Sequence, residues 1–322
     1  MTASALVQTL AAAAGGAAHP PGLSSCGDCE GDATVLADRP DGAVVRHGGA
    51  VAKAHAADTD RSALAVRVEV AAHPLLAGIL LPPLTRPSPA GPRAVTAWPY
   101  GTPVDPADPG AAPWEEAATL LARLHAVAPG LLHGPLPPMR GPAKVARALA
   151  RMRTAQPDRA LTGPVERAWR CLPGWARGET AAPPARGGRL CHGDLHLGQL
   201  VRHPVPQGPW LLIDIDDLGV GDAAWDLARP AAWYAAGLLP PLVWTRFLGA
   251  YRAAGGPAVR AGGDPWPELD VPARALTVQT AALALAKSAA ESRPLDEAEQ
   301  VMLDSCARIA ALPPELTCEA SS

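Results

Sequence analysis

The spacing of hydrophobic positions divides the chain into a strand-like first third and a helical remainder. Between Thr34 and Ala56, short apolar runs alternate with the turn signals Pro40-Asp41-Gly42 and Gly48-Gly49. This pattern is typical of β-strands joined by tight turns. Within it, the run from Val51 to His55 predicts one strand.

A helix and a second β region follow. Asp58 or Thr59 is placed to cap a helix that runs to Ala72 and ends before a proline. Residues 94–97 then predict a strand that leads into Trp98-Pro99-Tyr100-Gly101. Ahead of all these elements, the first 25 residues are rich in Ala, Gly, Pro and Ser without periodicity, which predicts a flexible arm.

The rest of the chain carries apolar residues at helical spacing, as at Ala117, Leu120, Leu121 and Leu124. The helices expected there lie near residues 114–127, 142–155, 164–172, 228–237, 240–253, 271–291 and 294–311. We therefore predict an α+β, two-lobed fold. Its parts would be the arm (1–25), a small β-rich lobe (26–101) and a larger helical lobe (102–322).

Composition excludes several classes of protein. Hydrophobic residues make up 48% of the 322 residues and mean hydropathy is +0.05, which excludes a disordered chain. A net charge of −3 argues against a nucleic-acid partner. No apolar run approaches the roughly 20 residues that cross a bilayer, and the start lacks the positive charge of a secretory signal. We expect a soluble, cytoplasmic protein.

Two scarce residue types are informative. Cys26 and Cys29 form one C-x-x-C, which lacks a second pair at zinc-ribbon spacing and is interpreted as two reduced thiols. Lysine supplies only three of the 28 basic residues, at positions 53, 144 and 287. Because arginine is the default cation in this chain, a lysine indicates a site that needs a slim point charge against phosphate.

One segment concentrates unusual chemistry. It runs from Cys191 to Gln199 and reads C-H-G-D-L-H-L-G-Q, and a short apolar strand follows that ends in Asp214, Asp216 and Asp217. Carboxylates at the end of a buried strand are costly to desolvate unless a cation meets them, and oxygen ligands suit Mg²⁺. A His-x-Asp loop, an aspartate 20 residues later and the upstream strand lysine Lys53 follow the order of the protein-kinase signature.

These motifs resemble those of the aminoglycoside phosphotransferase family, in the protein-kinase-like superfamily. The resemblance rests on L-C-H-G-D-L-H-L-G-Q, L-L-I-D-I-D-D, G-D-A-A-W-D-L-A and L-A-R-L-H-A-V, and it covers residues 30–310. It implies that Asp194 is the catalytic aspartate, which orients the acceptor hydroxyl and accepts its proton. Gln199 and Asp214 would hold Mg²⁺ on the phosphates of ATP.

The resemblance also implies a nucleotide site in the first lobe. Lys53 would pair with the α- and β-phosphates and would be braced by Glu69. Trp98 and Tyr100 would belong to the hinge that contacts adenine, mainly through backbone groups.

Three departures from the family pattern bear on these roles. Gln199 stands where the family usually has Asn, a form that resembles actinobacterial maltokinases and glucosamine kinases. The first lobe has no G-x-G-x-x-G, which leaves the Pro40-Asp41-Gly42 turn to cover the phosphates. Asp216 and Asp217 lie close to Asp214, so either could be the second metal ligand.

These features favour a kinase that phosphorylates a hydroxyl of a small molecule, either an aminoglycoside-like antibiotic in a resistance role or an amino sugar. The alternatives are a kinase-like subunit that acts on a peptide, with a partner protein, and a nucleotide-binding pseudokinase. Retention of Lys53, Asp194 and Asp214 favours an active enzyme. Between Asp264 and Asp304, eight acids against three bases favour a cationic acceptor, although a solvated helix face gives the same pattern.

Overall fold

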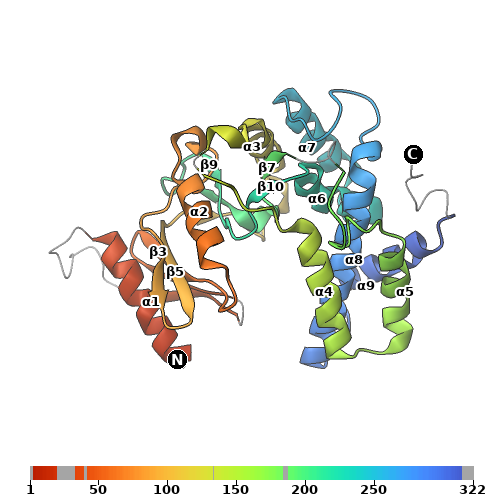
Figure 1. Cartoon of the computed structure of the whole chain (residues 1–322), viewed down its shortest axis with the longest axis horizontal. Helices are drawn as coiled ribbons and strands as arrows, with labels where there is room; N and C mark the ends of the chain where they lie inside the picture. The colour runs from red at the N-terminus through yellow and green to blue at the C-terminus, as the bar shows by residue number, and fades with distance from the viewer. Residues whose placement is uncertain (1–2, 20–32, 40–41, 133, 184–187, 314–322) are drawn as a thin grey trace. The chain divides into compact units, whose positions relative to one another are not determined.

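A five-stranded antiparallel sheet in the order β1-β2-β3-β5-β4 dominates the first third of the chain (Figure 1). Its strands are β1 (Thr34–Arg39), β2 (Gly42–His47), β3 (Ala50–Ala54), β4 (Ser88–Ala90) and β5 (Arg93–Pro99). The turn between β2 and β3 contains Gly48 at φ +55°, a left-handed conformation that glycine adopts without steric cost. The strands and turn expected there are confirmed.

The computed structural model describes residues 3–19, 33–39, 42–132, 134–183 and 188–313. Most of the expected Pro40-Asp41-Gly42 turn lies outside these ranges, as do Cys26 and Cys29.

Helix α1 (Ala3–Ala18) covers one face of the five-stranded sheet. Its side chains Leu6, Leu10 and Ala14 pack against the buried residues Val45 and Ala52. Residues 3–18 are therefore not the flexible arm that the composition predicted. Alanine is the best helix former but gives little contrast between a buried and an exposed face, so the periodicity was hidden.

Helix α2 (Arg61–Ala71) begins slightly later than expected, because its N-cap is Asp60. The Asp60 carboxylate accepts hydrogen bonds from the backbone N–H groups of Ser62 and Ala63. Further on, a three-stranded sheet pairs β6 (Thr102–Pro103) with β8 (Leu200–Arg202), and β8 with β9 (Trp210–Leu212). Short 3₁₀ helices, η1 (Pro74–Leu76), η2 (Pro109–Ala111), η3 (Pro129–Leu131) and η5 (Leu197–Gln199), complete the connections.

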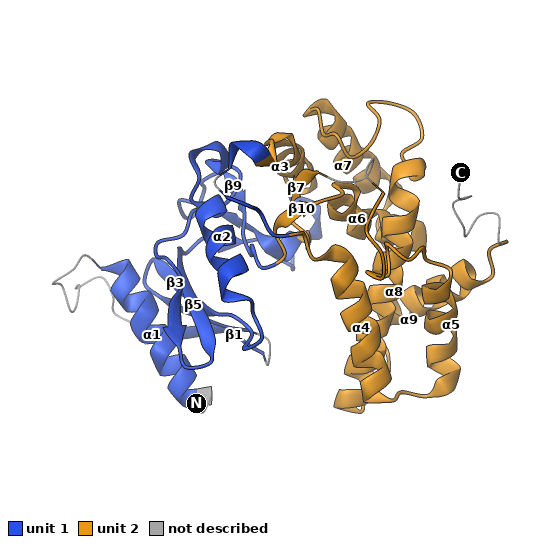
Figure 2. Ribbon diagram, viewed as in Figure 1, with its two compact units in different colours: residues 1–113, 130–137, 197–216 blue, residues 114–129, 138–196, 217–322 orange. Residues whose placement is uncertain are grey.

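The chain divides into two compact units (Figure 2). Unit 1 contains residues 1–113, 130–137 and 197–216, and unit 2 contains residues 114–129, 138–196 and 217–322. This division differs from the predicted boundary between residues 101 and 102, because residues 102–113 belong to unit 1. The pairing of β6 with β8, and of β8 with β9, carries the segment of Gln199 and Asp214 into unit 1. Local patterns do not reveal such long-range pairing.

Unit 2 is mainly helical. Its helices are α3 (Trp114–Ala126), α4 (Gly141–Ala155), α5 (Arg159–Arg170), α6 (Ala224–Ala236), α7 (Pro241–Ala253), α8 (Trp266–Glu291) and α9 (Glu297–Ala310). The long helix α8 packs against α4, α5, α6 and α9. The seven helices expected from apolar spacing are all present. Strands β7 (Arg189–Cys191) and β10 (Gly219–Gly221) form a small antiparallel ribbon. Among the described helices, none is long and apolar enough to cross a membrane.

Candidate active site

Strand β3 presents Lys53 on the side of the sheet opposite to Ala52 and Ala54, which belong to the core under α1. The Lys53 amine lies 2.7 Å from Oδ1 of Asp214 and 3.0 Å from Oδ2 of Asp216. Burial lowers the pKa of Lys53, but the charges of Asp214 and Asp216 outweigh this effect and hold the pKa above its usual range. Lys53 therefore carries its charge at any physiological pH.

Asp214 adopts a left-handed backbone conformation, with φ +63°, which aspartate tolerates better than most residues. Its Oδ1 accepts a hydrogen bond from Lys53, and its Oδ2 accepts one from Nε2 of Gln199 at 3.2 Å. Gln199 and Asp214 thus lie in direct contact, and together they offer an amide oxygen and a carboxylate. Carboxylate and amide oxygens suit Mg²⁺, so these residues fit the predicted ion.

A buried hydrogen-bond chain anchors Asp216. Nδ1 of His55 lies 2.9 Å from Oδ1 of Asp216, and Nε2 of His55 lies 2.9 Å from the hydroxyl of Thr96. The same hydroxyl accepts the indole N–H of Trp98. Burial raises the pKa of Asp216, but Lys53 and then His55 more than offset this and keep it low. Asp216 thus orients Lys53. His55 lies two residues after Lys53, just past the end of β3, and both side chains reach Asp216.

The structure pairs Lys53 with acids other than Glu69, the partner that the resemblance implies. Lys53 pairs with Asp214 and Asp216, whereas Glu69 is exposed on α2. The buried face of α2 includes Arg67 and Val68. Glu69 was chosen for its residue type and spacing, but the helical phase turns it to solvent.

The expected hinge residues are engaged within unit 1. Trp98 packs against a small apolar cluster of Leu81, Val201 and Leu211. The guanidinium of Arg46 lies 3.5 Å from the ring centroid of Tyr100. The backbone N–H of Tyr100 donates to Gly49, and its carbonyl oxygen lies 3.1 Å from Nδ1 of His203. A backbone contact between Tyr100 and adenine would compete with these bonds.

The loop that carries Asp194 leaves β7 and is shaped by Asp226 of α6. The Asp226 carboxylate accepts the backbone N–H of His192 at 2.6 Å and that of Gly193 at 2.7 Å. It also lies 2.9 Å from Nε2 of His125, whose Nδ1 lies 2.7 Å from the Tyr251 hydroxyl. Burial raises the pKa of Asp226, but the hydrogen bond and charge of His125 hold it below its usual value.

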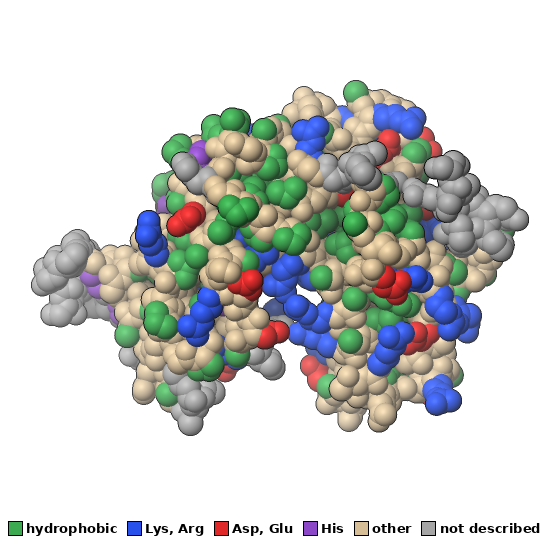
Figure 3. Space-filling view, viewed as in Figure 1, with side chains coloured by type: hydrophobic (Ala, Val, Ile, Leu, Met, Phe, Trp, Pro, Cys, Tyr) green, Lys and Arg blue, Asp and Glu red, His purple; other side chains and the backbone are tan. Residues whose placement is uncertain are grey.

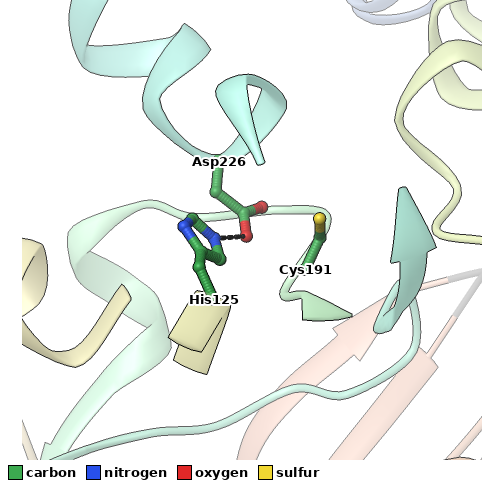
Figure 4. A group of neighbouring side chains, drawn as sticks. All are labelled: His125, Cys191 and Asp226. Atoms are coloured by element: carbon green, nitrogen blue, oxygen red, sulfur yellow. Dashed lines mark hydrogen bonds and ion pairs between the residues drawn. The ribbon is translucent and has the colours of Figure 1, made fainter. Parts of the chain in front are cut away.

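Figure 4 shows His125, Cys191 and Asp226 together, with ligand-type atoms within 4.8 Å of one another. The arrangement does not suit a metal. The Asp226 oxygens already accept N–H groups, and burial raises the pKa of the Cys191 thiol well above its usual value, whereas a metal ligand is a thiolate. The cluster instead stabilises the loop before Asp194.

Asp194 itself is held between two cations. Nζ of Lys144, on α4, lies 2.7 Å from its Oδ2, and Arg229, on α6, donates to its Oδ1 at 2.7 Å. Burial raises the pKa of Asp194, but Lys144 and then Arg229 outweigh this and lower it well below its usual range. The group is an ionised carboxylate that is restrained at both oxygens.

A hollow in unit 2 borders Asp194. The other residues that line it are Gly141, Gly193, Leu195, Trp225, Arg229, Leu276 and Gln279. Asp194 is therefore the single acid in this described lining. The acids between Asp264 and Asp304 are largely engaged elsewhere: Glu268, Asp270, Glu291 and Glu299 pair with arginines, and Asp296 caps α9. None of these acids lines the hollow beside Asp194.

The structure thus groups Lys53, Gln199 and Asp214 in unit 1 and places Asp194 in unit 2. Lys144 and Arg229 were not predicted as site residues. The scarcity of lysine was the available signal for Lys144. Basic side chains also gather along α4 (Figure 3), whose sequence carries Arg147 and Arg151 in addition to Lys144.

Comparison with known proteins identifies the family. A model of the phosphotransferase enzyme family matches residues 39–269, well over half of the chain. The chain belongs to this family. The expected family and enzyme class are therefore confirmed: the protein is a small-molecule phosphotransferase whose acceptor is an alcohol group. No curated protein matches the sequence.

Solved structures with the same architecture include other kinases. Choline kinase from Cryptosporidium parvum Iowa II has a TM-score of 0.59 and 11% identity, covering 91% of this chain and 92% of that one. A thermostable mutant of the aminoglycoside phosphotransferase APH(4)-Ia has a TM-score of 0.57 and 14% identity, and the match covers 88% of this chain and 96% of that one. A choline/ethanolamine kinase family protein from Mesorhizobium loti has a TM-score of 0.53 and 17% identity, and the match covers 92% of this chain and 94% of that one. The phosphotransferase therefore has the two-lobed, protein-kinase-like α+β fold that was predicted.

Proposed function

We propose that this phosphotransferase moves the γ-phosphoryl group of ATP, with Mg²⁺, to a hydroxyl of a small molecule. The observation that carries the proposal is Asp194, an ionised carboxylate at the edge of a hollow, held by Lys144 and Arg229. Such a carboxylate accepts a hydrogen bond from an alcohol and takes its proton. The alcohol oxygen then bonds to the γ-phosphorus, the bond to the bridging oxygen breaks, and ADP leaves.

Unit 1 supplies groups suited to the nucleotide. Lys53 offers a permanent positive charge for phosphate oxygens, and Asp214 and Gln199 offer the oxygens that would hold Mg²⁺. The bound ion would neutralise negative charge on the phosphates. Crystals of APH(4)-Ia with AMP-PNP and of spectinomycin phosphotransferase with ADP support ATP as the donor.

For the acceptor, we propose an aminoglycoside-like antibiotic or an amino sugar. Hygromycin B and spectinomycin in the crystals of related phosphotransferases support the first class.

The test is a screen of ATP consumption with aminoglycosides, other antibiotics, sugars and choline-like alcohols, followed by ³¹P NMR of the product. We expect one class to give a phosphate monoester with equimolar ADP. The Asp194→Asn variant should give none, because it cannot accept the proton. The proposal would be contradicted if no class gave a phosphorylated alcohol and the wild type and Asp194→Asn formed ADP at the same rate.

A further inference from the structure

The start of α4 is built for close approach to α6. A Cβ atom on Gly141 would lie 3.0 Å from Cε3 of Trp225 and 3.0 Å from Sδ of Met139, so only glycine fits without movement. The backbone N–H of Arg140 also donates to the carbonyl oxygen of Asp217. These contacts fix the first turn of α4, and Lys144 lies one turn beyond Arg140.

Lys144 bridges two carboxylates with a single amine. Nζ lies 2.7 Å from Oδ2 of Asp194 and 2.7 Å from Oδ2 of Asp217. The side chains of Lys144 and Asp217 are only 19% and 11% exposed, so water screens these contacts weakly. Arg140 lies 3.1 Å from the other oxygen of Asp217, which fixes that carboxylate in turn. The bridge joins the catalytic loop to the residue just before β10.

Two cations on the two oxygens of Asp194 fix the rotation of its carboxylate. Arg229 holds Oδ1 and also donates to the carbonyl oxygen of Leu195, while Lys144 holds Oδ2. Each carboxylate oxygen has about two acceptor sites, so each keeps about one for another donor. Without Lys144, only one side of the carboxylate would be restrained.

We propose that Lys144 is a positioning residue that sets the orientation of the Asp194 carboxylate toward the acceptor hydroxyl. This inference rests on the proposed function, because Asp194 must act on an acceptor. The role needs lysine, because its single amine lies 2.7 Å from one oxygen of Asp194 and 2.7 Å from one oxygen of Asp217. A guanidinium would place its donors on separate nitrogens. Lysine is retained here in a chain that otherwise uses arginine for 25 of its 28 basic residues.

The experiment compares Lys144→Met and Lys144→Arg with Lys287→Met and Lys287→Arg, using the acceptor found by the screen. Lys287 is the matched control, because it is an exposed lysine on α8 outside the site. We expect Lys144→Met to lower kcat about 10- to 100-fold, the loss typical of a misplaced catalytic group, with AMP-PNP affinity unchanged. Lys144→Arg should recover only part of kcat.

The pH–rate profile separates positioning from simple folding support. The charged or titratable groups that act on Asp194 are Lys144, Arg229 and His196. Removing the Lys144 charge raises the pKa of Asp194, so the fall in kcat on the acid side of the profile should begin at a higher pH in Lys144→Met than in the wild type. In Lys144→Arg this fall should begin at the wild-type pH, because the positive charge is kept.

The outcomes distinguish this inference from the proposed function. If Lys144→Met has the same kcat and the same acid-side pH dependence as Lys287→Met, Lys144 has no positioning role. If Asp194→Asn is inactive in the same assay, the proposed function still stands. Activity in Asp194→Asn would overturn both. If Lys144→Met fails to fold, Lys144→Arg decides, and a kcat equal to that of Lys287→Arg would overturn the inference.

Discussion

Gly193, in the loop that carries Asp194, lies directly against the backbone of Asp217. Its φ is +85°, and a Cβ atom there would lie 2.8 Å from Cβ of Asp217 and closer still to the carbonyl oxygen. The contact explains why glycine precedes Asp194. Any side chain would push this loop away from Asp217, which Lys144 bridges to Asp194.

We therefore expect Gly193→Ala to lose most activity and about 1–3 kcal/mol of unfolding free energy. Gly237→Ala is the matched control, because Gly237 has φ +84° with nothing within 4 Å of an added Cβ. It should cost about 1 kcal/mol from backbone strain alone and keep full activity. Denaturant unfolding and kcat measure both effects. Equal kcat in the two variants would mean that the contact with Asp217 is unimportant.

Asp226→Asn should destabilise the protein by about 3–5 kcal/mol, because an amide cannot accept all the N–H groups of His192, Gly193 and His125. The pKa of Asp226 is lowered in the folded state, so its contribution to stability is complete above the unfolded value of about 4 and is lost as pH falls below it. The difference in unfolding free energy between wild type and variant should be constant near neutral pH and narrow in acid. A difference that grew in acid would contradict the assignment.

Thr96→Val should cost about 1–3 kcal/mol, because it leaves the indole N–H of Trp98 and the Nε2 of His55 without a partner. Valine has nearly the same shape, so lost packing contributes little. Thr96→Ser keeps the hydroxyl and is the control. If the two variants unfold at the same denaturant concentration, the hydroxyl does not hold His55 and Asp216 in place.

Much of the fold could be predicted from the sequence, because most helices and strands have a clear pattern of apolar residues or turn residues within their own segment. The helices of unit 2 have clear apolar spacing, and the β2–β3 hairpin has its glycine turn. Helix α1 was missed because an alanine-rich helix shows little amphipathic contrast. The division into units does not follow local patterns, because β6 pairs with β8, which lies about 100 residues later in the sequence.

In the site, the order and spacing of the motifs predicted four residues: Lys53, Asp194, Gln199 and Asp214. The side chains that other elements place against these four residues could not be predicted from motif spacing. Glu69 was chosen in place of Asp216, and Lys144 was noted only as a scarce lysine. Which side chains face each other depends on helical phase and on long-range packing, which spacing alone does not specify.

Gln199 should work through its carbonyl oxygen. Its Nε2 donates to Asp214, so Gln199→Asn could keep an oxygen near the ion and part of the activity, while Gln199→Leu removes every polar atom and should lose nearly all of it. The measurement is kcat as a function of Mg²⁺ concentration. Gln199→Leu should need far more Mg²⁺ than Gln199→Asn. A Leu variant with the Mg²⁺ dependence of the wild type would show that the ion is held by other residues.

The most direct test of the account is the affinity for AMP-PNP with and without Mg²⁺, measured by titration calorimetry in wild type, Asp214→Ala and Asp194→Ala. In the proposed function, Asp214 acts on the metal and nucleotide, and Asp194 acts on the acceptor. We therefore expect Mg²⁺-dependent binding in the wild type, nearly the same affinity in Asp194→Ala, and a loss of at least about tenfold, or 1.4 kcal/mol, in Asp214→Ala. An equal loss in both variants, or binding that ignores Mg²⁺, would contradict the account.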